Sequence, residues 1–222
     1  MINCYDRKLV IFDLDGCLVD TAGEIALMVN TVRKKLGLEP LDIEFVRRTI
    51  GGGLRKILEK CLTDAPELVE KALSLAPESY IEISGTIAKP YPGVVDTLRA
   101  LQGKRRIALA TNKIRPATVK LFDALDITKY FDYMCCGDDC PNVKPNPECL
   151  YMVLENLGMT AKEAVMVGDT PTDVKTAANA GMDAIAVTYG MAKPEDVRAS
   201  NPYLCVDSMA EVLDLLLPPD ER

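Results

Sequence analysis

The chain alternates short apolar runs with segments of helical periodicity. Its first apolar run, Leu9 to Phe12, predicts a strand that is buried on both faces. Comparable runs return later, at residues 107–110, 133–136, 165–167, 184–187 and, more weakly, 204–206. Helical patterns accompany them, up to about residue 125, over 147–157, up to 180 and up to about 217. Repeated strand-helix units predict an α/β protein with a parallel sheet covered on both faces, and we expect the first strand to join that sheet.

The stretch between the first strand and the later ones is helical. Apolar residues recur at helical spacing over residues 21–36, and Thr21 with Glu24 has the spacing of a capping box. Residues 42–84 keep a helical pattern, with interruptions expected at Gly51-Gly52-Gly53, Pro66 and Pro77. Residues 89–93, Lys-Pro-Tyr-Pro-Gly, are typical of a stiff turn or hinge. We therefore expect a core made of residues 1–16 and 90–222, and a helical domain of residues 17–89 inserted on two linkers.

Composition limits the partners that the protein can have. The 222 residues carry a net charge of −7, and the pI of about 4.8 argues against nucleic acid, which needs a basic face. No apolar run approaches the roughly 18 residues of a membrane span, and the N-terminus lacks a secretory apolar core. We expect a cytoplasmic protein, a monomer or a homodimer, that binds a small molecule rather than a membrane.

The chain has no histidine, which excludes the Ser-His and Cys-His mechanisms and histidine-ligated metals. It has eight cysteines but no Cys-x-x-Cys pair. Cys135, Cys136 and Cys140 form the one cluster, and reduced structural thiols are the alternative to a metal role there. Any chemistry must therefore use carboxylates, lysine, hydroxyl groups and a metal bound by oxygen.

Two carboxylates follow the first strand, in Asp13-Leu14-Asp15-Gly16. Because strand side chains alternate between faces, Asp13 and Asp15 point the same way. Neighbouring carboxylates repel unless one is protonated or a cation lies between them. This pattern favours a catalytic pair or a metal site, although Asp and Gly also occur where a strand simply leaves the sheet in a turn.

Other polar residues follow later strands. Each lies just beyond the carboxyl end of a predicted strand, where open parallel sheets bind ligands: Thr111 and Asn112, Lys144, and Gly168-Asp169 with Asp173. Polar residues are common in turns, but turns alone do not explain why four loops bring carboxylates, a hydroxyl group and a lysine to the same edge. The sequence therefore predicts one site at that edge.

This residue set suits phosphoryl transfer. A carboxylate is the available nucleophile, and aspartyl-phosphate formation is one of its established uses. Asp13 and Asp169 offer the oxygen ligands that Mg²⁺ prefers, and Lys144 would neutralise developing charge. The Thr111 hydroxyl group would donate to a phosphate oxygen, and Asp15 would move the proton of the leaving group and then of water.

The chain resembles the haloacid dehalogenase superfamily over nearly its whole length. The resemblance rests on four motifs in order: Asp13-Leu14-Asp15-Gly16-Cys17-Leu18-Val19-Asp20-Thr21, Thr111-Asn112, Lys144-Pro145, and Gly168-Asp169 with Asp173. It implies a Rossmann-like parallel-sheet core with an inserted α-helical cap domain. One departure is Thr170-Pro171-Thr172, where relatives often carry Ser and Asn.

Roles are implied at the matching positions. Asp13 would be the nucleophile and Asp15 the acid/base. Thr111 and Asn112 would bind phosphate, and Lys144 would be the charge partner. Mg²⁺ would be bound by Asp13, by the side chain of Asp169 and by the backbone carbonyl of Asp15, with Asp173 supporting the metal waters or Lys144.

Short segments that are less specific than the four motifs indicate the substrate. The segments that resemble the phosphoglycolate phosphatase branch are Tyr91-Pro92-Gly93-Val94, Thr111-Asn112-Lys113, Tyr130-Phe131-Asp132, Gly137-Asp138-Asp139 and Thr188-Tyr189-Gly190. In such enzymes the cap selects the substrate, and Gly51-Gly52-Gly53 with Arg55 is the candidate loop. We expect Gly52, Arg55 and Lys113 to bind the substrate, with Arg55 and Lys113 receiving a carboxylate. A helix start with a surface arginine is the alternative for the cap loop.

Rival functions remain open at this point. A pyrophosphatase or another metabolite phosphatase would use the same metal site. A non-catalytic phosphoprotein-binding module on this fold is possible, although such a relative would be expected to have lost Asp13, Asp15 or Asp169. The absence of histidine argues against a β-phosphoglucomutase, and Asp15 argues against a dehalogenase.

Overall fold

The computed structural model describes residues 4–221. Residues 1–3 and 222, the outer ends of the expected core ranges, lie outside the described residues. Among the described residues, none of the helices combines the length and the apolar character that crossing a membrane would require.

Six strands form one parallel sheet in the order β5-β4-β1-β6-β7-β8. Their bounds are β1 Leu9–Phe12, β4 Arg106–Ala110, β5 Tyr133–Cys135, β6 Ala164–Gly168, β7 Asp183–Val187 and β8 Leu204–Val206. The predicted strands and the α/β fold class are confirmed, because each apolar run forms a strand and the first run lies between β4 and β6.

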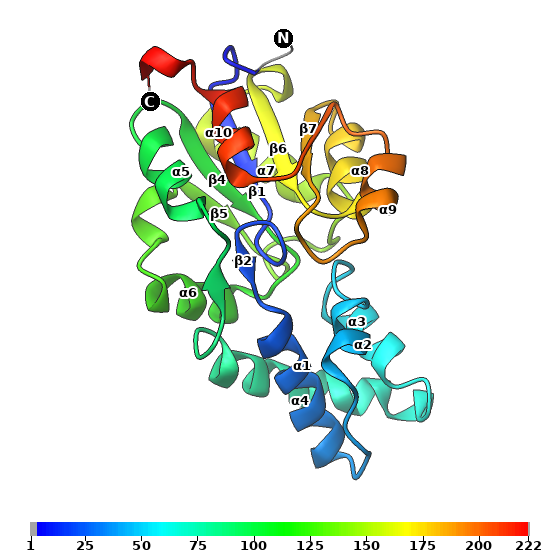
Figure 1. The fold of residues 1–222 in the computed structure, drawn as a ribbon. Helices are drawn as coiled ribbons and strands as arrows, with labels where there is room; N and C mark the ends of the chain where they lie inside the picture. The colour runs from blue at the N-terminus through cyan, green and yellow to red at the C-terminus, as the bar shows by residue number, and fades with distance from the viewer. Residues whose placement is uncertain (1–3, 222) are drawn as a thin grey trace.

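The sheet is covered on both faces, as the apolar runs require. Val10 and Phe12 of β1 belong to one hydrophobic cluster, and Leu9 and Ile11 belong to another on the opposite face. The first face packs against α5 (Val94–Leu101), α6 (Arg115–Ala124) and α10 (Met209–Leu216). The second packs against α7 (Glu148–Leu157), α8 (Pro171–Asn179) and α9 (Pro194–Ala199). Figure 1 shows α5 and α6 on one side of the strands and α8 and α9 on the other.

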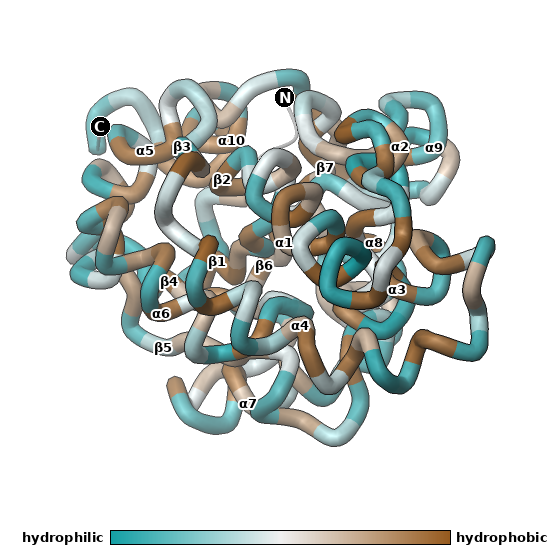
Figure 2. Tube along the Cα trace, turned by 90° about the horizontal axis from the view of Figure 1, so that it is seen from below, coloured by the Kyte–Doolittle hydropathy of each residue, from teal (hydrophilic) through white to brown (hydrophobic). Residues whose placement is uncertain are grey.

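The helices between β1 and α5 form a separate layer, which we call the cap. It contains α1 (Ala22–Lys35), α2 (Ile43–Arg47), α3 (Leu54–Cys61), the short 3-10 helix η1 (Pro66–Leu68) and α4 (Val69–Ile83). These helices surround a third hydrophobic cluster, which also includes Ala117 of α6. The cap lies beyond one end of the strands in Figure 1, and Figure 2 views the molecule from that end, so that the cap helices are on the viewer's side of the sheet. Further 3-10 helices are η2 (Thr128–Tyr130), η3 (Ala161–Glu163) and η4 (Pro219–Glu221).

One predicted interruption of the cap is wrong. Helix α4 continues through Pro77, although proline lacks the N–H that a helix interior uses. Packing of α4 along α1 and α6 holds the helix together across this position.

The predicted capping box is wrong as well, although helix α1 is confirmed. The Thr21 side chain makes no cap hydrogen bond; its hydroxyl group donates to Asp15 Oδ1 at 2.7 Å. Glu24 is fully buried, and its Oε1 accepts the backbone N–H groups of Thr86, Ile87 and Ala88 at 2.8 to 3.0 Å. Both side chains are thus engaged with other segments of the chain rather than with the start of α1.

The two linkers between core and cap lie side by side. Strand β2 (Val19–Asp20) pairs antiparallel with β3 (Lys89–Pro90), and the Tyr91 N–H donates to the Leu18 carbonyl group at 3.0 Å. Glu24 binds the returning linker just before β3. The cap is therefore joined to the core by one two-stranded ribbon.

We expect Glu24→Ala to lower the free energy of unfolding by about 3 kcal/mol, because three backbone N–H groups lose the buried carboxylate that accepts them. Glu24→Gln keeps a carbonyl acceptor, so its cost should be about 1 kcal/mol. Urea denaturation followed by circular dichroism measures both values. Glu78→Ala, an exposed change on α4, is the control and should stay within about 0.5 kcal/mol of the unmodified protein. A Glu24→Ala protein as stable as this control would contradict the role of Glu24.

Candidate active site

The site lies where the chain reverses its direction across the sheet. After β1 the chain adds β4 and β5 on one side and then returns to add β6, β7 and β8 on the other. Such a switch point leaves a crevice at the carboxyl ends of the strands. Asp13 follows β1 directly, and its N–H still donates to the Val167 carbonyl group of β6 at 2.8 Å. The sheet therefore holds Asp13 in the crevice.

Lys144 organises the charges around Asp13. Its Nζ donates to Asp13 Oδ1 at 2.7 Å, to Asp173 Oδ1 at 2.7 Å and to the carbonyl oxygen of Ala110 at 2.9 Å. The side chain is buried, so its three ammonium protons are all used by protein acceptors. Lys144 is thereby fixed between two carboxylates that would otherwise repel each other.

Burial shifts the titration of these groups. It raises the pKa of Asp13 to about 7, and the charge of Asp173 adds to this effect while Lys144 opposes it. Burial raises the pKa of Asp169 well above its usual range, again with help from Asp173 and Asp13. Burial alone would lower the pKa of Lys144, but the charges of Asp13 and Asp173 outweigh it and raise that pKa. The crevice thus holds more negative charge than one lysine compensates.

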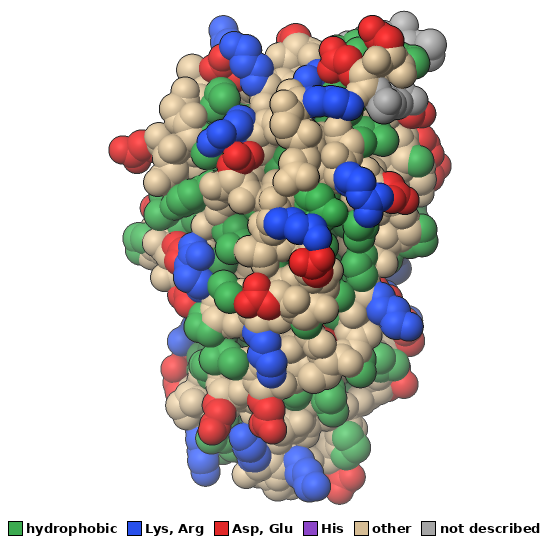
Figure 3. Space-filling view, turned by 90° about the vertical axis from the view of Figure 1, so that its left-hand side faces the viewer, with side chains coloured by type: hydrophobic (Ala, Val, Ile, Leu, Met, Phe, Trp, Pro, Cys, Tyr) green, Lys and Arg blue, Asp and Glu red, His purple; other side chains and the backbone are tan. Residues whose placement is uncertain are grey.

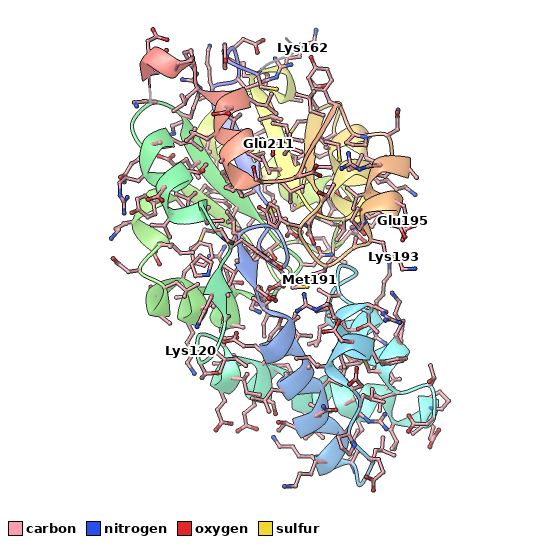
Figure 4. The ribbon with its side chains drawn as sticks, viewed as in Figure 1. Lys120, Lys162, Met191, Lys193, Glu195 and Glu211 are labelled. Carbon is pink, nitrogen blue, oxygen red and sulfur yellow. The ribbon has the colours of Figure 1, made fainter. Side chains whose placement is uncertain are left out.

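Asp169 is fully buried between two glycines. A Cβ on Gly16 would lie 2.1 Å from Asp169 Oδ2, and one on Gly190 would lie 2.3 Å from it. Asp169 Oδ2 accepts the N–H of Met191 at 2.6 Å, and Figure 4 shows Met191 at the level where the core meets the cap. Asp169 Oδ1 has no hydrogen-bond partner among the described residues. A buried carboxylate oxygen without a partner needs a cation or a proton.

The carboxylates fit a metal ion. One oxygen from each of Asp13, Asp169 and Asp173 lies within 4.8 Å of the others. All three are hard oxygen donors, and the pKa values of Asp13 and Asp169, which burial raises first and neighbouring carboxylates raise further, would fall if a cation lay beside them. Asp173, however, already binds Lys144 through Oδ1 and Thr170 through Oδ2. Asp13 and Asp169 therefore offer the free oxygens, and Asp173 supports them.

The departure at Thr170-Pro171-Thr172 leaves the loop well fixed. Thr170 is the N-cap of α8, and its N–H and hydroxyl group both donate to Asp173 Oδ2, at 3.1 and 2.7 Å. Pro171 takes the first position of the helix, where its missing N–H costs nothing. A capping box thus orients Asp173 toward Lys144.

Thr111 and Asn112 follow β4 and form different hydrogen bonds. The Thr111 hydroxyl oxygen accepts the Lys113 N–H at 3.2 Å, which leaves its proton for a ligand. The Asn112 amide binds the Lys144 backbone twice: Oδ1 accepts the N–H at 2.9 Å, and Nδ2 donates to the carbonyl oxygen at 3.2 Å. Asn112 therefore holds the Lys144 loop in place.

Asp15 lies beside the triad of carboxylates rather than in it. Its Oδ1 accepts the Thr21 hydroxyl proton at 2.7 Å and lies 3.4 Å from Lys113 Nζ. Lys113 Nζ also donates to the Tyr80 hydroxyl oxygen at 2.7 Å. Tyr80 is on α4, so this contact joins the cap to the core.

One cavity connects most of the predicted residues. Asp13, Asp15, Thr111, Asn112, Lys113 and Lys144 line it from the core, and Gly51, Gly53 and Tyr80 are among the residues that line it from the cap. Its volume is about 30 Å³, room for one or two water molecules, so any phosphate ester enters only if the cap moves.

Two predicted cap residues lie elsewhere. Arg55 is exposed, and its Nη1 is 2.6 Å from Glu70 Oε1; it does not line the cavity. Gly52 does not line it either, because this residue faces the Lys56 side chain. The expected role of Arg55 in carboxylate binding is not supported by this position, since α3 begins at Leu54 and turns Arg55 toward solvent and η1–α4.

Comparison with known proteins identifies the family. A family model described as haloacid dehalogenase-like hydrolase matches residues 10–187. The chain belongs to this family. Phosphoglycolate phosphatase 1 of Pseudomonas aeruginosa is 34% identical, covering 96% of this chain and 84% of that protein, and phosphoglycolate phosphatase of Aquifex aeolicus is 36% identical, covering 84% and 87%. A crystal structure of a predicted phosphoglycolate phosphatase from Haemophilus somnus has a TM-score of 0.86 at 27% identity, covering 94% of this chain and 97% of that one.

Sequence reasoning missed three residues at this haloacid dehalogenase-like site. Tyr80 is hidden within the helical pattern of α4, and Met191 within a loop without a motif. Thr21 could have been found, because it ends the first motif, but its spacing to Glu24 favoured a capping box. The thiols do not form a metal site: Cys135 Sγ and Cys140 Sγ are 3.4 Å apart, and among the described residues only the three carboxylates form a cluster suited to a metal.

We expect Mg²⁺ to raise Tm more at pH 8 than at pH 5. The pKa of Asp13 is raised to about 7 and that of Asp169 is raised as well, so the native protein holds protons that the unfolded chain has lost, and the contribution of these groups to stability falls as pH rises. A cation replaces these protons and competes with them at low pH. At ten times Kd, binding adds about 1.4 kcal/mol, or about 4 °C in Tm.

Thermal unfolding at constant ionic strength measures this shift. Asp169→Asn should abolish the shift. Asp96→Asn changes an exposed carboxylate on α5 that is not part of the site, so this control should retain the shift. An equal Mg²⁺ shift at both pH values would count against metal binding by the buried carboxylates.

Proposed function

We propose that this protein is a Mg²⁺-dependent phosphatase that hydrolyses a small phosphomonoester, 2-phosphoglycolate, through an aspartyl-phosphate intermediate. The observation that carries this proposal is the Asp13 carboxylate, fixed by Lys144 in a cavity beneath the cap and next to the free Oδ1 of Asp169. The names of the curated relatives support the substrate.

In the first step Asp13 attacks phosphorus. Lys144 opposes the rise in the Asp13 pKa that burial causes, holds the carboxylate in the cavity, and offsets the charge that develops on the phosphoryl oxygens. The Thr111 hydroxyl group donates its free proton to a phosphoryl oxygen, and Asn112 acts by holding Lys144. Phosphoryl transfer depends chiefly on such positioning and charge neutralisation.

Asp15 moves the protons. In the first step it protonates the leaving ester oxygen, and in the second it accepts a proton from the water that attacks the aspartyl phosphate. The Thr21 hydroxyl group and Lys113 orient this carboxylate from the cap side of the cavity. Regeneration of Asp13 completes the cycle.

Asp13 and Asp169 would hold Mg²⁺, with Asp173 supporting the site and the backbone carbonyl of Asp15 as a further ligand. When bound, the ion supplies positive charge to the phosphoryl oxygens and relieves the repulsion between the carboxylates.

A small anionic substrate fits the surroundings. Lys113 lines the cavity together with Lys144. Lys144 is already bound to Asp13 and Asp173, so Lys113 is a second positive charge that an anionic substrate can meet. On the face shown in Figure 3, Lys and Arg side chains are interspersed with Asp and Glu, without the broad basic surface that nucleic acid needs. The eight cysteines are all free, which is consistent with a cytoplasmic protein; monomer or homodimer stays a prediction.

Purified protein should release phosphate from 2-phosphoglycolate and from p-nitrophenyl phosphate only with Mg²⁺. Asp13→Asn should lower kcat by at least about 1000-fold, because the nucleophile is lost. Asp96→Asn is the control and should keep full activity. Undiminished activity of Asp13→Asn would sink the mechanism, and absence of activity in the unmodified protein would favour a binding module. Faster release from pyrophosphate than from 2-phosphoglycolate would favour a pyrophosphatase.

Asp15→Asn should separate the two steps. p-Nitrophenolate leaves without a proton donor, so the first step survives, while water attack loses its base. Rapid mixing with p-nitrophenyl phosphate should give a burst of about one equivalent per site, followed by turnover at least about 100-fold slower than normal. Slow turnover without a burst would contradict the assignment of Asp15 to the second step.

A further inference from the structure

A cap tyrosine covers the second lysine of the cavity. Tyr80 of α4 and Lys113, which follows β4, meet at 2.7 Å between the hydroxyl oxygen and Nζ, and Nζ lies 4.0 Å from the ring centroid. Both side chains are buried. A phenol ring over an ammonium group stabilises its charge without neutralising it.

The charge of Lys113 is poorly balanced by the protein. Its nearest carboxylate oxygen, Asp15 Oδ1, is 3.4 Å away and already accepts the Thr21 hydroxyl proton at 2.7 Å. In the described part of the chain, Asp15 is the one acid with which Lys113 forms an ion pair. An ammonium group has three donors, of which Tyr80 and Asp15 take two. Lys113 therefore has one proton left for a ligand, and the carboxylate that balances its charge is shared with the Thr21 hydroxyl group.

Tyr80 has a free donor as well. Its oxygen accepts from Lys113, and none of the hydrogen bonds formed by the described residues uses its own O–H proton. Burial, with the charges of Asp15 and Glu24, raises the pKa of Tyr80 well above its usual range, so the phenol keeps that proton. Lys113 and Tyr80 thus present two adjacent donors, one of them charged.

These donors line the same cavity as Asp13, Thr111 and Lys144. Because Lys113 and Asp13 line the same cavity, one small molecule that enters when the cap opens can present an anion to Lys113 and a phosphoryl group to Asp13. In 2-phosphoglycolate a single methylene group separates the ester oxygen from the carboxylate, so both anionic groups belong to one short molecule.

We propose that Tyr80 is a specificity-determining residue: its hydroxyl group and the Lys113 ammonium group together bind the substrate carboxylate, which closes the cap over the core. The inference rests on the proposed function and adds to it the cap residue that recognises the substrate. An ester without the carboxylate leaves the third Lys113 proton and the Tyr80 proton without an acceptor. Losing one hydrogen bond to a charged group changes selectivity about 10- to 100-fold.

The test compares kcat/KM for 2-phosphoglycolate with kcat/KM for ethyl phosphate and for the phosphate ester of glycolamide, in which a neutral amide replaces the carboxylate. In the unmodified protein both ratios should favour 2-phosphoglycolate. Tyr80→Phe retains the ring and its packing, and it should lower both ratios about 10-fold or more, mainly through KM. Lys113→Met should lower them further.

Lys120→Met is the matched control. Lys120, labelled in Figure 4, lies on α6 and donates to the carbonyl groups of Ile81 and Glu82 at the end of α4, outside the cavity. The Lys120→Met substitution removes a lysine contact between core and cap but no group that lines the cavity, so it should leave both ratios unchanged. Thermal unfolding of each variant confirms that the protein compared is folded.

The outcomes separate the two proposals. If the unmodified protein does not prefer 2-phosphoglycolate over its analogues, the proposed substrate is wrong, and the role of Tyr80 is overturned with it. If it does, but Tyr80→Phe keeps the same ratios, only the role of Tyr80 is overturned. Equal losses of selectivity in Tyr80→Phe and Lys120→Met would also overturn it, because any loosening of the cap would then have the same effect.

Discussion

The site depends on one buried ammonium group between two carboxylates. Lys144 lies 2.7 Å from both Asp13 and Asp173, and removal of either partner from such a group leaves an uncompensated charge out of reach of water. The surrounding structure serves this contact. Asn112 fixes the lysine backbone, the Ala110 carbonyl takes its third proton, and the capping box of α8 aims Asp173 at it. The remaining negative charge in the crevice is what makes it selective for a cation.

The cap contributes differently from the core. Core residues reach the cavity from the ends of strands, where the sheet fixes the backbone. Cap residues reach it from a glycine loop and from the last turn of α4, on helices that pack around the separate hydrophobic cluster of the cap. Gly51 lies against Thr170, and Gly53 lies against Asn112, so the loop touches the same core segments that orient Lys144 and Asp173. When the cap is closed, its glycine loop therefore rests on the core segments that position Lys144 and Asp173.

The fold and the core motifs could be predicted because each depends on local pattern. Apolar runs give strands, and the polar residues that follow them converge because parallel strands end at the same edge. The cap site could not be predicted in this way. Arg55 and Tyr80 both lie on amphipathic helices, and a shift of one position around a helix decides whether a side chain faces solvent or the cavity. The capping box failed for a related reason: the spacing of Thr21 and Glu24 matched a local contact, but their side chains bind partners outside the first turn of α1, namely Asp15 and residues 86–88.

The ribbon of β2 and β3 has a kinetic consequence. Because Glu24 fastens the start of the cap to the returning linker, the two connections are coupled, and we expect the cap to turn as one body. Gly51, Gly53 and Tyr80 then enter or leave the cavity in a single motion. A molecule that meets only one of these contacts slows closure as a whole, so the exclusion of water and the choice of substrate are decided in the same step rather than in sequence.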